Sequence, residues 1–163
     1  MAGPLNARFH AIAALGLLAM MAMAPAWAGD DVAPPPPKSA EPAFADDGLY
    51  QDLGGRNGIV RIVDSSMAVV LADPRILHQF DDTNMERFKG LLADHLCVVA
   101  GGPCIYTGHS MADAHRGLHL HNMDFNALVE DLQDGMDKEG IGFRTQNRLL
   151  ARLAPMQHDV VTR

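Results

Sequence analysis

The longest regular pattern of apolar and polar positions lies between residues 85 and 99. Its apolar members are Met85, Phe88, Leu92, Leu96 and Val99. Steps of three and four residues place side chains on one face of an α-helix, so this pattern predicts a helix with one buried face. The sequence Gly101-Gly102-Pro103 follows directly and predicts that the helix ends there, because glycine and proline interrupt helices.

Similar patterns predict helices along the rest of the chain from Leu49 onward. Apolar residues recur at helical spacing in 58–71, 125–140 and 144–160, and a short segment at 49–53 ends at Gly54-Gly55. Pro155 predicts a kink in the last helix, because proline removes a backbone donor. The alternation that is typical of β-strands is missing. We therefore expect an all-α domain.

Two capping-box patterns predict where helices begin. Thr83 precedes Glu86 by three residues, and Ser110 precedes Asp113 by the same distance. In such a box the first side chain accepts a backbone N–H, and the acidic side chain reaches back to the first residue. The first box predicts the start of the 85–99 helix. The second predicts a short helical turn that carries His115.

Residues 1–28 have the pattern of a secretory signal peptide. An apolar run at 11–24 follows Arg8, and Ala26-Trp27-Ala28 is a small-x-small cleavage site. The run is short for a membrane-spanning helix, although an uncleaved N-terminal anchor remains the alternative. Residues 29–48 include four successive prolines and predict an extended linker before a folded domain at 49–163. We expect an exported, periplasmic protein without stable membrane insertion after cleavage.

The charge of the chain excludes some partners. The formal net charge is -7, and loss of Arg8 with the signal peptide makes the exported form more acidic still. An acidic surface argues against nucleic acid and against anionic lipid as partners.

An apolar helix face followed by one histidine in a short turn suits a haem. Haem is a large apolar disc that needs apolar walls and a nitrogen ligand for its iron. The neutral imidazole of His115 can supply that ligand and leave the opposite position open to a small gas. The sequence contains no Cys-x-x-Cys-His motif, so the usual covalent attachment is not expected.

Five motifs occur in a fixed order between Leu49 and about Val161. They are Leu49-Tyr50-x-x-Leu53-Gly54-Gly55, Leu71-Ala72-Asp73-Pro74, Phe80 with Thr83-Asn84-Met85, Gly101-Gly102-Pro103-x-x-Tyr106-Thr107-Gly108, and Met111-x-x-Ala114-His115-x-Gly117. In this order and spacing the chain resembles the group I truncated haemoglobins. The resemblance implies a two-over-two helical sandwich around one non-covalently bound haem b per chain.

The resemblance also implies roles for individual residues. His115 matches the proximal iron ligand, Phe80 matches the phenylalanine that stacks on the haem face, and Tyr106 matches a tyrosine near the haem rim. The expected haem-binding residues are Phe80, Thr83, Met85, Phe88, Leu92, Tyr106, Met111 and Leu118. The expected distal wall, on the side of the iron opposite His115, consists of Met67, Phe88 and Leu92.

The expected distal wall departs from the family pattern. Members of the family often place a tyrosine or another hydrogen-bond donor above the iron, whereas Met67, Phe88 and Leu92 donate no hydrogen bond. Loss of one hydrogen bond of about 1–3 kcal/mol corresponds to a roughly five- to hundredfold lower affinity. We therefore expect weak oxygen binding, fast oxygen release or easy oxidation of the iron.

These features predict a ligand-binding haemoprotein rather than a dedicated enzyme. It would reversibly bind oxygen, carbon monoxide or nitric oxide at five-coordinate iron, for transport, sensing or detoxification, and it would need a reductant that the sequence does not identify. The first alternative is a periplasmic haem redox enzyme, such as a peroxidase or a nitric oxide- or nitrite-converting protein. Peroxide cleavage benefits from a distal acid or base, which the expected wall lacks. A second alternative is a haem-free four-helix interaction module.

Other histidines leave alternatives open. His119 and His121 could form a separate metal site with His115, although Gly117 makes helical spacing doubtful there. His78 and His95 are candidates for a distal ligand in a six-coordinate form of the haem iron. Because His95 lies beside the apolar stripe, we expect an exposed or partly buried side chain.

The two cysteines and two basic residues also remain open. An exported destination permits a disulfide between Cys97 and Cys104, but two free thiols fit the spacing equally well. Arg87 and Lys89 could contact the haem propionates. They fit equally well as exposed charges on the helix face.

Overall fold

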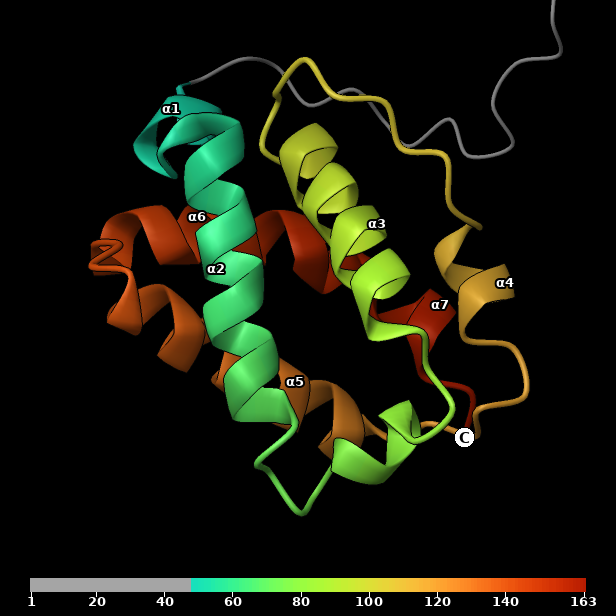
Figure 1. The fold of residues 1–163 in the computed structure, drawn as a ribbon. Helices are drawn as coiled ribbons and strands as arrows, with labels where there is room; N and C mark the ends of the chain where they lie inside the picture. Colours follow the sequence, from blue (N-terminus) through green and yellow to red (C-terminus); the bar gives the residue numbers. More distant parts are fainter. Residues whose placement is uncertain (1–47) are drawn as a thin grey trace, which may run out of the picture. The chain divides into compact units, whose positions relative to one another are not determined.

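The computed structural model describes residues 48–163, and every regular element in that range is helical (Figure 1). The elements are α1 (Leu49–Asp52), α2 (Gly55–Val70), the 3-10 helix η1 (Leu77–Phe80), α3 (Met85–Val99), α4 (Met111–Ala114), α5 (Asn122–Lys138), α6 (Phe143–Leu153), the 3-10 helix η2 (Ala154–Met156) and α7 (Gln157–Val160). The predicted signal peptide, and the predicted linker except for Gly48, lie outside the described residues. Among the residues described, no helix has the length and apolar character needed to cross a bilayer.

Helices α2 and α3 form one layer, and α5 and α6 form the other (Figure 1). The contact between α2 and α5 is the largest between any two helices of the described chain. It is close because α5 carries Gly135 where it crosses Ser66 of α2. A Cβ atom at Gly135 would lie 2.6 Å from the backbone N and Cα atoms of Ser66. The two-over-two arrangement that the resemblance implies is confirmed, and Gly135 allows the close approach of α2 and α5.

The core lies between the two layers, but α3 is buried unevenly along its apolar face. Leu96 and Val99, near its C-terminal end, are fully buried. Met85, Phe88 and Leu92, nearer its N-terminal end, pack against the core and stay partly exposed. The apolar stripe is therefore one face of one helix, as predicted, and its N-terminal half is available to line a site.

Several helix boundaries differ from the prediction. Helix α2 begins at Gly55, three residues before the predicted start at residue 58. The prediction missed its first turn because that turn, which follows Gly54 with φ 82°, is polar and shows no apolar pattern. Thr83 was the wrong cap for α3. The N-cap is Asn84, whose side chain accepts a hydrogen bond from the Arg87 N–H at 3.0 Å. The predicted last helix is divided into α6, η2 and α7, with Pro155 in η2.

The C-terminal residues are hydrogen-bonded to the chain that follows α4. The backbone N–H groups of Thr162 and Arg163 donate to the Leu120 carbonyl at 3.0 and 3.2 Å, and the Leu120 N–H donates to Thr162 Oγ1 at 3.1 Å. These three bonds attach the end of the chain between α4 and α5, next to the label C in Figure 1.

Candidate functional site

His115 lies directly after α4, and its ring has a defined orientation. Ser110 caps the helix as predicted, since its hydroxyl accepts the Asp113 N–H at 3.2 Å. The backbone N–H of His115 donates to the Met111 carbonyl at 3.1 Å, and ring Nδ1 lies 2.8 Å from the same oxygen. A carbonyl only accepts hydrogen bonds, so Nδ1 carries the hydrogen. The neutral ring therefore keeps its lone pair on Nε2, as a metal-binding imidazole requires.

An apolar wall extends from η1 along α3. Phe80 and Phe88 pack edge to face, with ring centroids 5.5 Å apart and an interplanar angle of 67°. Met85 and Leu92 continue this surface, and all four side chains are partly buried against the core. We call these four residues the α3 wall, and residues 111–115 the α4 wall.

His95 is buried, so the expectation of an exposed or partly buried side chain was wrong. It is 4 % exposed and follows Leu92 by three residues, which places it on the same helical face as Phe88 and Leu92. Burial and the nearby charge of His115 lower the pKa of His95 to about 4, so its ring is neutral at pH 7. Burial is the larger of these two causes.

Tyr106 connects the loop before α4 to α3. Its ring packs edge to face on His95, with centroids 5.2 Å apart, and the side chain is 9 % exposed. Its hydroxyl donates to the His109 carbonyl at 2.9 Å. The hydroxyl hydrogen that could have met a haem propionate is therefore used within the loop.

The remaining predicted site residues differ in burial. Met67 of α2 is fully buried in the core that supports the α3 wall. Thr83 and Met111 are partly buried, whereas Leu118 is 43 % exposed. The structure therefore brings the expected distal residues into one apolar core and leaves Leu118 at the surface.

The metal-cluster alternative receives no support from the structure. His119 and His121 are exposed, and His119 has a positive φ of 56°. Within residues 48–163, no three His, Cys, Asp or Glu side chains are grouped so that they could hold a metal ion.

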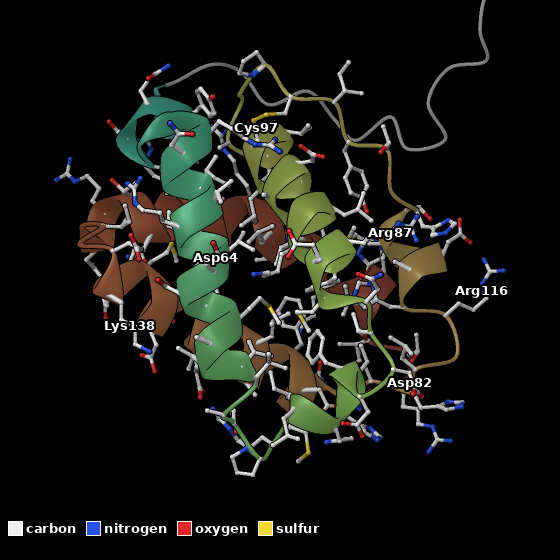
Figure 2. All side chains as sticks on the ribbon, in the orientation of Figure 1. Asp64, Asp82, Arg87, Cys97, Arg116 and Lys138 are labelled. Carbon is white, nitrogen blue, oxygen red and sulfur yellow. A yellow bond between two sulfur atoms is a disulfide. The ribbon has the colours of Figure 1, made fainter. Side chains whose placement is uncertain are left out.

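The two basic residues of α3 face different neighbours. Lys89 Nζ lies 2.7 Å from Asp64 Oδ1 of α2, and this pairing raises the pKa of Lys89. Figure 2 shows Asp64 on the α2 side of α3 and Arg87 on the side toward α4. Arg87 is therefore better placed than Lys89 for a haem carboxylate near the α4 wall.

Cys97 and Cys104 form a disulfide, with Cα atoms 5.9 Å apart (Figure 2). Cys97 belongs to the last turn of α3, and Cys104 follows the Gly101-Gly102-Pro103 turn. The Gly102 N–H donates to the Cys97 carbonyl at 2.8 Å and closes this turn. The disulfide thus fixes the start of the loop that leads to α4.

The donors and surfaces of this site fit a haem. Nε2 of His115 offers one neutral nitrogen ligand, and the α3 wall offers an aromatic and aliphatic surface for an apolar ring. The basic side chain of Arg87 is exposed on α3, on the side toward α4 in the view of Figure 2.

Comparisons with known proteins agree with this fit. Residues 48–162 match the family model of bacterial-like globins. The Group 1 truncated hemoglobin GlbN of Mycolicibacterium paratuberculosis is 30% identical over 125 residues, which cover 77% of this chain and 89% of the relative. The Group 1 truncated hemoglobin of Tetrahymena pyriformis is 36% identical over 93 residues, or 57% of this chain and 77% of the relative.

Solved structures show the same fold. The Fe(III) form of the Tetrahymena pyriformis truncated hemoglobin superposes with a TM-score of 0.69 at 30% identity, covering 71% of this chain and 98% of that one. The 2/2 hemoglobin of Synechococcus sp. PCC 7002, solved in the cyanomet state with covalently attached heme, gives a TM-score of 0.65 at 27% identity over the same shares. The chain therefore belongs to the bacterial-like globins and, within them, to the group 1 truncated haemoglobins.

Proposed function

We propose that the protein holds one haem b without a covalent bond and uses it to bind a diatomic gas reversibly, with His115 as the proximal ligand of five-coordinate iron. The observation that carries the proposal is the short contact between His115 Nδ1 and the Met111 carbonyl, which sets the tautomer of the ring. Histidines that bind metals usually donate their other ring N–H to a carbonyl or carboxylate, which orients the ring and increases its basicity. The Met111 carbonyl has this position at 2.8 Å from Nδ1. A bound haem would supply an iron able to coordinate oxygen, carbon monoxide or nitric oxide, with His115 holding that iron.

The residues expected on the distal side are apolar and offer no hydrogen-bond donor. Met67, Phe88 and Leu92 are apolar, and Met67 is fully buried. Such a wall supports gas binding with fast release of oxygen, because it gives no stabilisation to the partial charge on the ligand. Oxygen transport or sensing at high oxygen levels suits this property better than tight storage.

The same wall argues against the redox-enzyme alternative. None of the three side chains can donate or accept a proton, whereas peroxide cleavage benefits from a distal acid or base. The ionisable side chain on that face of α3, His95, packs edge to face on Tyr106. We therefore favour gas binding, with a reductant that keeps the iron ferrous still to be identified.

Optical spectra test the proposal directly. The purified protein should show a Soret band in the ferric, ferrous and carbon monoxide-bound states. His115→Ala should lose or strongly shift this band, because it removes Nε2. His158→Ala removes an exposed imidazole of α7 and serves as the matched control that should keep the spectrum unchanged. An unchanged spectrum in the His115 variant would contradict the assignment.

We also propose that the protein is exported to the periplasm after cleavage behind Ala28. The support is the apolar run at 11–24 with its cleavage site. A disulfide within the folded domain is also typical of oxidising compartments. N-terminal sequencing of protein from the periplasmic fraction should begin at Gly29, whereas intact Met1 in the cytoplasmic fraction would contradict export.

A further inference from the structure

The part of the proposed haem site that carries the iron ligand has little structure of its own. Helix α4 has four residues, and its Ala112, Asp113 and Ala114 side chains are exposed. Its backbone hydrogen bonds are local and include the Ser110 cap, the bond from the Ala114 N–H to the Ser110 carbonyl and the bonds to the Met111 carbonyl. A helix of this length is not stable in isolation. The position of His115 relative to α3 therefore depends on how the chain before and after α4 is attached.

The chain after α4 is attached away from α3. Leu120 is hydrogen-bonded to Thr162 and Arg163, and α4 itself contacts α7. These contacts join α4 to the C-terminal end of the chain. They reach α3 by a longer, non-covalent route through α7, η2 and α6, because α6 in turn contacts α3.

The chain before α4 is attached to α3 at two points. The first is the Cys97–Cys104 disulfide at the end of α3. The second is the packing of Tyr106 on His95, strengthened by the bond from the Tyr106 hydroxyl to the His109 carbonyl. Of these two attachments, the disulfide is covalent. It fixes Cys104, two residues before Tyr106, next to the end of α3 and so favours the packing of Tyr106 on His95.

We propose that the Cys97–Cys104 disulfide joins the α3 wall to the α4 wall and thereby controls how tightly the protein retains haem. Cys97 is in the helix that carries Phe88 and Leu92, and Cys104 begins the segment that ends at His115. Cys97 and Cys104 are thus positioning residues for the iron ligand. The inference rests on the proposed binding of haem by His115.

The coupling must act in both directions. If the disulfide increases haem affinity by some factor, bound haem stabilises the disulfide against reduction by the same factor. Coupling between two sites in one protein typically amounts to about 5- to 150-fold. We expect at least a fivefold effect, because the link and the ligand order the same segment.

The two sulfur atoms differ in access, which defines how the link is opened. Cys97 is fully buried, whereas Cys104 is partly exposed, and Arg56 Nη1 lies 3.3 Å from its sulfur. A thiolate of a dithiol reductant would attack Cys104 Sγ, break the S–S bond and release Cys97, which takes up a proton. The second thiol of the reductant then displaces Cys104 as a thiol and leaves the reductant as its own disulfide.

Haem transfer to apomyoglobin tests the first direction of the coupling through the rate of haem loss. Haem-loaded wild type and the variant Cys97→Ser/Cys104→Ser are mixed with excess apomyoglobin, and haem loss is followed in the Soret region. Leu149→Ala is the control, because Leu149 is fully buried in α6 and belongs to neither wall. We expect the double variant to lose haem at least fivefold faster than both wild type and the control. Equal rates for the double variant and the control would overturn the inference.

Disulfide reduction measures the second direction without any variant. The wild-type protein is equilibrated in mixtures of dithiothreitol and its oxidised form, with and without haem, and the free thiols are alkylated and counted by mass. The haem-bound protein is kept in the carbon monoxide form so that thiols do not bind iron. Half-reduction of its disulfide should require a ratio of dithiothreitol to oxidised dithiothreitol at least fivefold higher than in the haem-free protein. The same reduction midpoint in both forms overturns the inference while haem binding stands. A wild-type protein with no His115-dependent Soret band overturns the proposed function as well.

Discussion

The crossing of α2 and α5 predicts opposite effects for the same substitution at two helical glycines. At Gly135 a Cβ atom would lie 2.6 Å from the backbone N and Cα atoms of Ser66. Real Cβ atoms essentially never come within 3.0 Å of such atoms, and the backbone of α2 cannot rotate away as a side chain can. Gly135→Ala must therefore push the two helices apart along the largest helix contact of the domain.

The expected loss follows from two opposing terms. Overpacking a tight core typically costs about 1–3 kcal/mol, and a displaced backbone belongs at the upper end of that range. Alanine has a better helix propensity than glycine by about 1 kcal/mol, which offsets part of the loss. We expect Gly135→Ala to lower the free energy of unfolding by about 2 kcal/mol.

Gly90 provides the matched control. It lies in the middle of α3, it is exposed, and a Cβ there would meet no atom within 4 Å. Gly90→Ala should therefore raise the free energy of unfolding by about 0.5–1 kcal/mol, since only the propensity term applies. Urea unfolding followed by far-UV circular dichroism measures both values. If the two variants shift stability in the same direction, the steric reasoning about the crossing is wrong.

Three further predictions concern the site. Met67→Tyr should slow oxygen dissociation by about 5- to 100-fold relative to Met67→Phe in stopped-flow experiments, because only the tyrosine adds a donor worth about 1–3 kcal/mol; equal rates would argue against Met67 as a distal residue. The pKa of His95 is lowered to about 4, so its contribution to stability is complete above pH 6.5 and is lost as the pH falls toward 4. The free energy of unfolding falls between pH 7 and pH 4.5, and His95→Phe should make this fall smaller by about 2–3 kcal/mol. A fall of the same size in the variant would show that protonation of His95 does not cause it. Removing the disulfide with Cys97→Ser/Cys104→Ser should lower the free energy of unfolding by about 2–3 kcal/mol, the value expected for so short a closed loop, and urea unfolding with no such loss would contradict it.

The main helices could be predicted from the sequence because their buried apolar residues repeat at the spacing of an α-helix. Phe88, Leu92, Leu96 and Val99 repeat at helical spacing, so α3 could be found from local pattern alone. The start of α2 could not, because its first turn is polar and begins at a glycine with positive φ. The cap of α3 was misplaced by one residue because Thr83 and Asn84 are adjacent, and both have side chains that cap helices.

The site was predicted less completely, since two of its features depend on contacts between distant segments. The burial of His95 results from Tyr106, which lies in a loop that no periodic pattern describes. The step of three residues from Leu92 was a usable signal, but a histidine at that position can also face solvent. The tautomer of His115 depends on the position of one carbonyl in a four-residue helix, and no sequence pattern specifies it.

The attachment of Thr162 and Arg163 to Leu120 has a practical consequence for anyone who expresses this protein. A purification tag or fluorescent partner fused behind Arg163 would pull on a segment five residues from His115 and could change gas affinity without touching the haem. Fusions are better placed ahead of Gly48, and reporters that must follow the last residue need a flexible spacer.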